Sequence, residues 1–375
     1  MSTASLVSAG FDRVADAFFG TIDEDGSGAA VSVWVDGVPV VELSGGVADV
    51  RDGRSFQSDT LAVIFSCTKG IASVLIGMLI ERGAIPSLDA PVVELWPEFG
   101  AHDKARLTIG DVLAHRGGVS APRRDLTIEE ALDGLVLADA LAAQEPLWPP
   151  GEDHQYHTIT HGAITAKLVT LATGSLIGRW VASAVAGPLA ADLWIGLPES
   201  EEWRVAHLVE DASPPDPLEG DPEAIYWVER ASNMFGVIGP LAFNQRSLHR
   251  DEIAGAGGIA TASGLAKFWS ATVTATNGLR LINDDTVDAL RKPRSEGPPH
   301  FLVGPPPYQS WGAGVMVPSD WQRYLSPSSF GHDGAGGQVA FADPEAKVGF
   351  AYLTNRMGDM ERGGSVVRAL SRALG

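Results

Sequence analysis

The chain has 375 residues, of which 45% are hydrophobic and 20% charged, so it is long enough for a large core divided between two lobes. Its formal net charge is −20. That charge argues against binding to a phosphate backbone, which needs clustered Lys and Arg, and it would repel an anionic membrane surface. We therefore expect neither a nucleic-acid partner nor a membrane partner.

Two further features favour a cytoplasmic location. The N-terminal stretch lacks the basic region and uninterrupted apolar run of a signal peptide, and the longest apolar stretch, near residues 71–80, is too short to span a bilayer. The one cysteine, Cys67, cannot form an intramolecular disulfide, which fits a reducing compartment. We expect Cys67 to be a packed small residue and not a nucleophile, because its helix would hold it beside Ser66 but pointing elsewhere.

The N-terminal part of the chain predicts a helix followed by a β-hairpin. Apolar residues at helical spacing predict an amphipathic helix over residues 5–19. The run "AAVSVWVDGVPVVELSGGVAD" (29–49) reads as two strands joined at Asp36-Gly37, a dipeptide typical of tight hairpins. The stretch "LAVIFSCTKGIASVLIGMLIERG" (61–83) then reads as an apolar run that enters one helix closed by a glycine.

Residues 84–250 read as helix and loop, and the C-terminal part returns to strands. The Pro-rich stretches 211–224 and 291–309 predict loops. The segments expected to form three short strands and a closing helix are 311–317, 329–343, 347–355 and 362–374.

This order predicts an α+β fold. An antiparallel sheet flanked by helices is built from both termini, residues 1–80 and 255–375. A mainly helical domain, residues 81–254, is inserted between them, and the active site is expected in the cleft between the two parts.

Ser66 and Lys69 are the first candidates for chemistry. A serine hydroxyl is a weak nucleophile at neutral pH and needs a base beside it. Residues three apart on a helix lie one above the other, so the Lys69 amine can approach the Ser66 oxygen, and a desolvated lysine can accept a proton. The Ser66 N–H, near a helix N-terminus, points where an oxyanion would be stabilised. A Ser-x-x-Lys motif is weak by itself, but this one stands at a strand-to-helix junction.

The stretch "PPGEDHQYHTITHGAITAKL" contributes Tyr156, which precedes a helix. A phenol there could relay protons beside the Ser-Lys pair, although a packed loop tyrosine is the simpler reading. His154, His157 and His161 have a spacing that hints at a metal. No cysteine or well-placed carboxylate completes such a site, so we expect solvated loop histidines and no metal or other cofactor.

A glycine-rich stretch follows later, in "SFGHDGAGGQVAFAD". Small residues from Gly334 to Gly337 would let a ligand approach the backbone closely, and a free N–H at Ala335 could be a second oxyanion donor. A glycine-rich bulge or turn is the structural alternative.

Together the three segments resemble the motifs of the serine β-lactamase and penicillin-binding-protein superfamily: Ser66-Cys-Thr-Lys69, Tyr156-His-Thr158 and His332-Asp333-Gly334. Segments 107–119, 255–268 and 341–355 also resemble that family, and the closest match is the class C-like group called family VIII carboxylesterases. The resemblance implies a β-lactamase/DD-peptidase-like fold. It also implies an acylated Ser66, Lys69 as base, Tyr156 as proton relay and an oxyanion hole formed by the Ser66 and Ala335 N–H groups.

Two departures from the lactamase pattern favour a neutral acyl substrate. His332-Asp333-Gly334 replaces the usual Lys-Thr-Gly, and an Asp beside a neutral His would weaken capture of a substrate carboxylate. Thr158 stands where β-lactamases generally have Asn. We expect His332, Asp333, Gly334 and Thr158 to line the pocket.

These observations predict a serine hydrolase that cleaves small-molecule carboxylic esters of short or medium acyl chains through an acyl-Ser66 intermediate. Alternatives are a β-lactamase, a linear-amide hydrolase or an acyltransferase of the same fold, and a non-catalytic binding protein is a further one. The oligomeric state stays open. The aromatic residues that could either line an acyl pocket or belong to the core are Trp148, Trp227, Phe235, Tyr308 and Trp311.

Overall fold

The computed structural model describes all residues except 1–4, 23–26, 211–217, 234–239 and 359. Its strands are Leu6–Val7 (β1), Gly28–Val35 (β2), Val38–Asp49 (β3), Arg54–Ser55 (β4), Ala62–Phe65 (β5), Leu193–Ile195 (β6), Gly258–Ala260 (β7), Ser310–Trp311 (β8), Met316–Val317 (β9), Phe330–Gly334 (β10), Gln338–Asp343 (β11) and Val348–Thr354 (β12). Its α-helices are Asp12–Phe19 (α1), Cys67–Glu81 (α2), Ile109–Leu113 (α3), Ile128–Leu132 (α4), Gly134–Ala143 (α5), Thr160–Thr173 (α6), Ile177–Val181 (α7), Gly187–Leu189 (α8), Pro222–Ser232 (α9), Arg246–Arg250 (α10), Ala262–Val273 (α11), Asp284–Arg291 (α12) and Glu361–Leu374 (α13).

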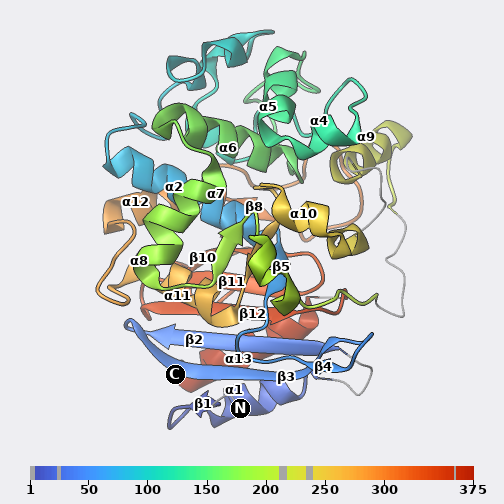
Figure 1. Cartoon of the computed structure of the whole chain (residues 1–375). Coiled ribbons are helices and arrows are strands. Elements are labelled where there is room, and N and C mark those ends of the chain that lie inside the picture. The colour runs from blue at the N-terminus through green and yellow to red at the C-terminus, as the bar shows by residue number, and fades with distance from the viewer. Residues whose placement is uncertain (1–4, 23–26, 211–217, 234–239, 359) are drawn as a thin grey trace.

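The large sheet is built from both ends of the chain. Its strand order is β1-β3-β2-β12-β11-β10-β9-β8, with β4 paired to β3, and its pairings are antiparallel. The pairing of β2 with β12 joins the N-terminal strands to the C-terminal ones, so the two termini lie at the same end of the molecule (Figure 1). The predicted α+β class with an antiparallel sheet flanked by helices is therefore confirmed.

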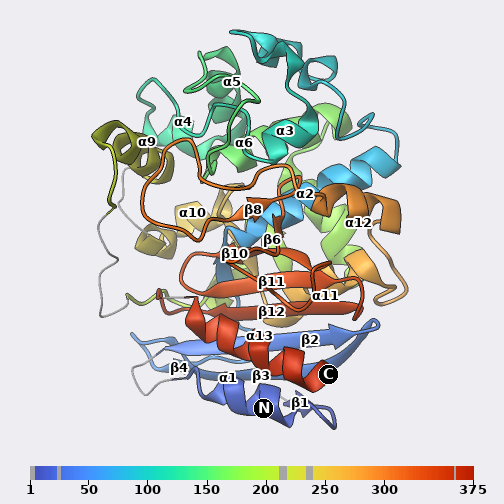
Figure 2. The same cartoon turned by 180° about the vertical axis from the view of Figure 1, so that it is seen from behind.

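Alternating side chains bury both faces of this sheet. On β12, Phe350 and Tyr352 belong to a core cluster shared with α1 and α13, whereas Ala351 and Leu353 belong to the main core with α2 and α11. Successive strand residues point to opposite faces, so a sheet covered by helices on both sides needs apolar residues at every position. Figure 2 shows α1 and α13 on the outer side of β2 and β3, away from the helical part.

A second, three-stranded sheet of order β5-β7-β6 supports the start of α2. All four β5 residues are buried, and β5 pairs antiparallel with β7. The strand β6 comes from within residues 81–254, so the segment expected to be mainly helical also contributes to this small sheet.

Four local expectations were wrong in detail. Residues 5–19 form a short edge strand and a helix from Asp12, because Leu6 and Val7 pair with β3. Residues 329–343 form two strands, β10 and β11, joined by a turn at residues 335–337, and 311–317 likewise splits into β8 and β9. Of the loop expected over 211–224, residues 211–217 lie outside the described residues, and α9 begins at Pro222, where Asp221 caps it by accepting a hydrogen bond from Glu223 N.

The hairpin at Asp36-Gly37 is confirmed, since both residues have positive φ (49° and 78°) as a tight two-residue turn requires. Loop 291–309 is also largely irregular, as expected, between α12 and β8.

Within the described residues, no single helix is long and apolar enough to cross a membrane. A bent pair of helices, Thr160–Thr173 with Ile177–Leu189, is long and apolar enough when the two are taken together, by length and composition alone.

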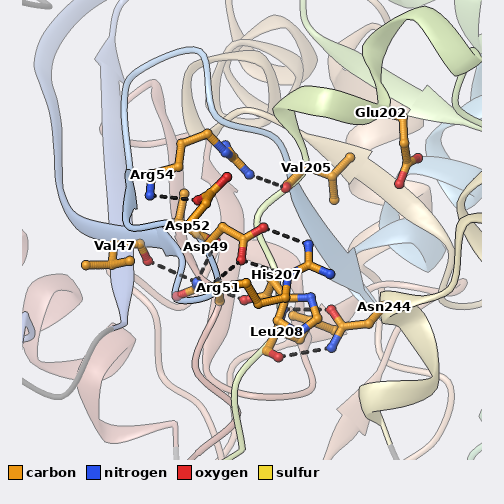
Figure 3. Close-up of polar contacts among 12 residues, drawn as sticks. Val47, Asp49, Arg51, Asp52, Arg54, Glu202, Val205, His207, Leu208 and Asn244 are labelled. Atoms are coloured by element: carbon orange, nitrogen blue, oxygen red, sulfur yellow. Dashed lines mark hydrogen bonds and ion pairs between the residues drawn. The ribbon is translucent and has the colours of Figure 1, made fainter.

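Polar contacts fasten the turn between β3 and β4 to the segment around residues 205–208 (Figure 3). Asp49 forms an ion pair with Arg51 at 2.7 Å, and the guanidinium of Arg54 donates to the Val205 carbonyl at 2.6 Å. Asn244 exchanges two hydrogen bonds with the backbone of Leu208. The hydrogen bonds from Arg54 and Asn244 satisfy backbone groups of Val205 and Leu208 that are not paired within a sheet.

Asn355 is fully buried, and its side chain links β2, the end of β3 and His207. Asn355→Ala is therefore expected to lower the free energy of unfolding by about 3 kcal/mol. Its side chain accepts from Gly28 N at 2.8 Å and donates to the carbonyls of Val47, Ala48 and His207 at 3.0–3.1 Å. Urea unfolding measures the loss. Asn233→Ala, at an exposed helix end, is the control and should change stability by less than about 0.5 kcal/mol; equal effects would contradict this role.

Candidate active site

Ser66 lies at the junction between β5 and α2, where the chain turns sharply. The preceding residue, Phe65, has a φ of 45°, which is unusual for a residue with a side chain. Ser66 is the N-cap of α2 and remains partly exposed. A strained residue directly before a partly exposed serine at a helix N-terminus is the kind of backbone that presents a reactive side chain.

The Lys69 ammonium nitrogen lies 3.0 Å from Ser66 Oγ. Lys69 is fully buried, and its Nζ also donates to the carbonyl of Gly255 at 2.6 Å. Among the described residues no carboxylate lies within ion-pair distance of Lys69. Burial therefore lowers the pKa of Lys69 to about 7, because no carboxylate offsets the loss of hydration of the charged amine. A substantial neutral fraction at pH 7 lets this amine act as a base.

The position of the Gly255 carbonyl depends on close packing against α6. A Cβ placed on Gly162 of α6 would lie 1.9 Å from Gly255 N, so only glycine lets the helix approach the 254–255 backbone this closely. This contact holds the segment that anchors Lys69.

Tyr156 lies over the Lys69 amine. The amine nitrogen is 4.9 Å from the centroid of the Tyr156 ring, and the ring stacks on Trp311 with centroids 5.1 Å apart. Burial raises the pKa of Tyr156, and its hydrogen bond with the Ser66 side chain lowers it by less. The phenol is consequently protonated at neutral pH and can donate a proton near Ser66.

A cluster of buried histidines lies behind Tyr156. His115 contacts Tyr156 edge-on at 5.0 Å between centroids, and its Nδ1 accepts a hydrogen bond from His157 N at 3.2 Å. The His115 carbonyl accepts from Gln155 N at 3.0 Å. His115 therefore contacts three consecutive residues, 155–157, and fixes the backbone that carries Tyr156.

The three histidines considered for a metal do not lie together. His157 and His161 are buried beside His115, with centroids 5.6 and 5.1 Å from it, and are not solvated as expected. His154 is buried as well and lies beside Asp153. Burial lowers the pKa of His157 to about 4 and that of His161 well below its usual value. In the part of the chain that the structure describes, no group of three His, Cys, Asp or Glu side chains could hold a metal ion.

The third segment contributes His332 on β10. Its ring lies 5.3 Å from the ring of Trp311 and 6.2 Å from that of Tyr156, centroid to centroid. Its Nδ1–H donates to the Asp333 carbonyl at 2.7 Å, and its buried Nε2 has no hydrogen-bond partner among the described residues. Burial lowers the pKa of His332 to about 3, so the ring is neutral.

Asp333 does not face the same side as His332, which corrects its placement among the pocket residues. It accepts hydrogen bonds from Tyr324 OH at 3.1 Å and Gln322 Nε2 at 2.9 Å. Neighbouring strand residues point to opposite faces, so a His332 directed at Tyr156 requires an Asp333 directed away.

Gly334 and Ala335 lie beside the Ser66 turn. A Cβ on Gly334 would lie 2.5 Å from the Ile64 carbonyl and 3.4 Å from Cys67 Sγ. Ala335 begins an exposed turn, and its N–H makes no hydrogen bond within the described structure. Cys67 is buried, as expected, and its thiol donates to the His332 carbonyl at 3.0 Å.

The remaining candidate residues differ in how far they are buried. Thr158 Oγ1 lies 3.5 Å from Ser232 Oγ of α9. Trp148 and Trp311 are buried, Trp227 and Tyr308 are partly exposed, and Phe235 falls outside the described residues. His115 and Gly255 were not singled out from sequence, although each lies in a segment that resembles the family. Only long-range packing gives them their positions.

Comparison with known proteins agrees with this fold. The family model described as Beta-lactamase matches residues 12–373. The "Esterase/beta-lactamase LipL" of Mycobacterium tuberculosis is 31% identical over 352 residues, covering 88% of this chain and 77% of that protein. A penicillin-binding protein homologue from Caulobacter crescentus superposes with a TM-score of 0.88 at 30% identity, and a family VIII carboxylesterase with 0.86 at 29%; each match covers 100% of both chains.

The chain therefore belongs to the beta-lactamase family, and it is a hydrolase with the β-lactamase/penicillin-binding-protein fold.

Proposed function

We propose that the protein is a serine carboxylesterase in which Ser66 is acylated. The main observation in support is the 3.0 Å contact between Ser66 Oγ and the buried Lys69 amine, which has no carboxylate partner among the described residues. The esterase names of relatives support the same reaction. The site lies in the cleft between residues 1–80 with 255–375 and residues 81–254. The first part supplies Ser66, Lys69 and His332, and the second supplies Tyr156 and Thr158.

Acylation begins when neutral Lys69 takes the Ser66 hydroxyl proton while Oγ attacks the ester carbonyl carbon. The resulting oxyanion accepts hydrogen bonds from the N–H groups of Ser66 and Ala335. The bond from the carbonyl carbon to the alcohol oxygen then breaks. The proton held by Lys69 passes through the Tyr156 hydroxyl to the leaving oxygen, which departs as the alcohol.

Deacylation repeats these steps with water as the nucleophile. Water loses a proton to the Tyr156–Lys69 pair as its oxygen attacks the acyl-Ser66 carbonyl carbon. Collapse of the second tetrahedral intermediate breaks the bond to Oγ, returns the proton to Ser66 and releases the carboxylic acid.

A neutral acyl group fits this site best. His332 stands where the family resemblance places a lysine cation, and its pKa of about 3 leaves it uncharged. We also propose short to medium acyl chains, because the rings of Tyr156, Trp311 and His332 lie within 5.1–6.2 Å of one another and narrow the space beside Ser66.

β-Lactam hydrolysis is the second candidate, because the relative LipL is named both esterase and beta-lactamase. It uses the same acyl-enzyme, so motifs alone do not separate the two. The expected order is fast ester cleavage and slow β-lactam cleavage, since a neutral His332 offers no charge to a β-lactam carboxylate.

The acid limb of the pH–rate profile tests Lys69 as the base. Protonated Lys69 cannot accept the Ser66 proton, so kcat/KM is expected to rise with pH, to reach half its plateau near pH 7, and to fall about tenfold per unit well below it. Initial rates on p-nitrophenyl butyrate between pH 5 and 9 measure this. A midpoint near 10, or constant rates down to pH 5, would exclude a neutral Lys69 as base.

Tyr156→Phe removes the hydroxyl that relays protons while keeping the stack on Trp311. We expect kcat to fall by about 10²- to 10⁴-fold with KM and the melting temperature nearly unchanged. Tyr226→Phe, on the exposed face of α9, is the matched control and should keep wild-type kinetics. Near wild-type kcat in Tyr156→Phe would assign the relay to another group.

A panel of p-nitrophenyl esters from acetate to dodecanoate tests the proposed substrate class. We expect the highest kcat/KM for esters with short to medium acyl chains. A maximum at dodecanoate would contradict the proposed narrowing beside Ser66, and the absence of turnover on every ester would contradict the esterase proposal itself.

A further inference from the structure

A cavity away from Ser66 is lined by residues of helices α4, α5, α6 and α7. Its volume is about 580 Å³, which is within the range of small-molecule sites. Its base is closed by residues 250–252, and none of the proposed catalytic residues lines it.

The walls of the cavity are largely aliphatic. Its apolar lining residues are Leu132, Leu135, Ala166, Leu176 and Ile177. Ala166 and Ile177 are buried at the inner end, whereas Leu176 is 50% exposed at the rim. Such walls accept a hydrocarbon body of several carbons.

The inner polar group is the carboxylate of Glu252. It is partly buried, and its Oε2 accepts a hydrogen bond from Gly178 N at 2.9 Å. Among the described residues no cation lies within ion-pair distance of it, and burial raises its pKa, against smaller opposing effects of Gly178 N and Arg179. Glu252 is therefore a carboxylate with capacity for another donor.

Other polar atoms of the lining also favour a cationic donor. Glu129, which is exposed, also lines the cavity. The one arginine of the lining, Arg250, is 74% exposed and already paired with Asp251 at 3.0 Å. An anionic ligand would meet unneutralised carboxylates, while a cation would gain hydrogen bonds.

We propose that this cavity binds a protonated primary amine with a short aliphatic body, the ammonium donating to Glu252 and the hydrocarbon lying against Leu135 and Ile177. The net charge of −20 favours the approach of such a cation. The site stands independently of the ester hydrolase proposal.

Its location connects it to the catalytic lysine. Ala254 N donates to the Glu252 carbonyl at 2.9 Å, and the next residue, Gly255, accepts from Lys69. Glu252, which lines the cavity, and Gly255, which accepts a hydrogen bond from Lys69, therefore belong to one short turn of the chain.

Methyl NMR on Ile- and Leu-labelled protein at pH 7.5 tests the site with three probes of equal length: hexylammonium, 1-hexanol and hexanoate. Hexylammonium is expected to shift the Ile177 methyl signal saturably. Glu252→Gln, which keeps an oxygen acceptor for Gly178 N, is expected to weaken binding about tenfold, the loss typical of a charge-assisted hydrogen bond. Hexanol should bind about as weakly, and hexanoate more weakly still. The control Glu296→Gln, exposed and outside the lining, should bind like wild type.

Leu176→Trp offers a second variant that does not touch Glu252, and its larger side chain at the rim should reduce binding as well. The proposal is overturned if hexylammonium gives no saturable shift at Ile177, if hexanol or hexanoate binds equally well, or if binding is undiminished in folded Glu252→Gln. Should Glu252→Gln fail to fold, undiminished binding by Leu176→Trp overturns it.

Discussion

Ser66→Ala is expected to reduce turnover of p-nitrophenyl butyrate by about 10⁴-fold or more, because the neighbouring Cys67 and Thr68 are buried and donate their protons to backbone carbonyls. The protein should still fold, since Ser66 is partly exposed and its hydroxyl makes no capping bond to the helix. Initial rates and a melting curve measure the two effects separately.

Fluorophosphonate labelling followed by mass spectrometry checks the same serine chemically. Wild type should carry one adduct at Ser66, Ser66→Ala should carry none, and the exposed-surface control Ser58→Ala should label like wild type. An unlabelled wild-type Ser66 would favour a binding protein that has kept the fold, and retained turnover in Ser66→Ala would refute the acyl-Ser66 mechanism.

Lys69→Met is expected to lower kcat/KM by about 10³-fold or more, since it removes the base 3.0 Å from Ser66 Oγ while filling the buried space with a chain of similar length. Lys69→Arg should not restore activity, because a guanidinium stays protonated at every pH used and cannot accept the Ser66 proton. The rates of both variants, with exposed Lys292→Met as control, measure this.

Activity of Lys69→Arg within about tenfold of wild type would show that Lys69 acts through its charge and not as a base. In that case the acid limb near pH 7 should also disappear from the wild-type profile. The pH–rate profile and the Lys69→Arg variant therefore test one assignment in two independent ways.

Local patterns predicted the parts of the site that depend on neighbours in sequence. The Ser66–Lys69 contact follows from three-residue spacing on a helix, and the Asp36-Gly37 hairpin follows from two residues that tolerate positive φ. The antiparallel sheet built from both termini followed from the order of strand and helix patterns along the chain.

Contacts between distant segments were not predictable in the same way. His115 reaches Tyr156 across about 40 residues of chain, and Gly255 reaches Lys69 across 186. Their roles come from tertiary packing, such as the close approach of Gly162 to the 254–255 backbone, which has no local pattern. Asp333 was misplaced because the family motif gave the pocket residues, whereas strand alternation decides which of two neighbours faces Tyr156.

The helix α1 shows a third kind of error. Residues 5–19 have helical periodicity, yet Leu6 and Val7 pair with Glu42 and Val41 of β3 instead. An exposed sheet edge offers unpaired backbone groups, and satisfying them outweighs two more residues of helix.

Initial rates on p-nitrophenyl butyrate and nitrocefin, measured side by side for wild type and Ser66→Ala, test the acyl-Ser66 esterase mechanism most directly. We expect fast ester cleavage that vanishes in Ser66→Ala, with slow or absent nitrocefin turnover. Fast nitrocefin cleavage with feeble ester cleavage would contradict it, and would mean that a neutral His332 suffices for β-lactam hydrolysis.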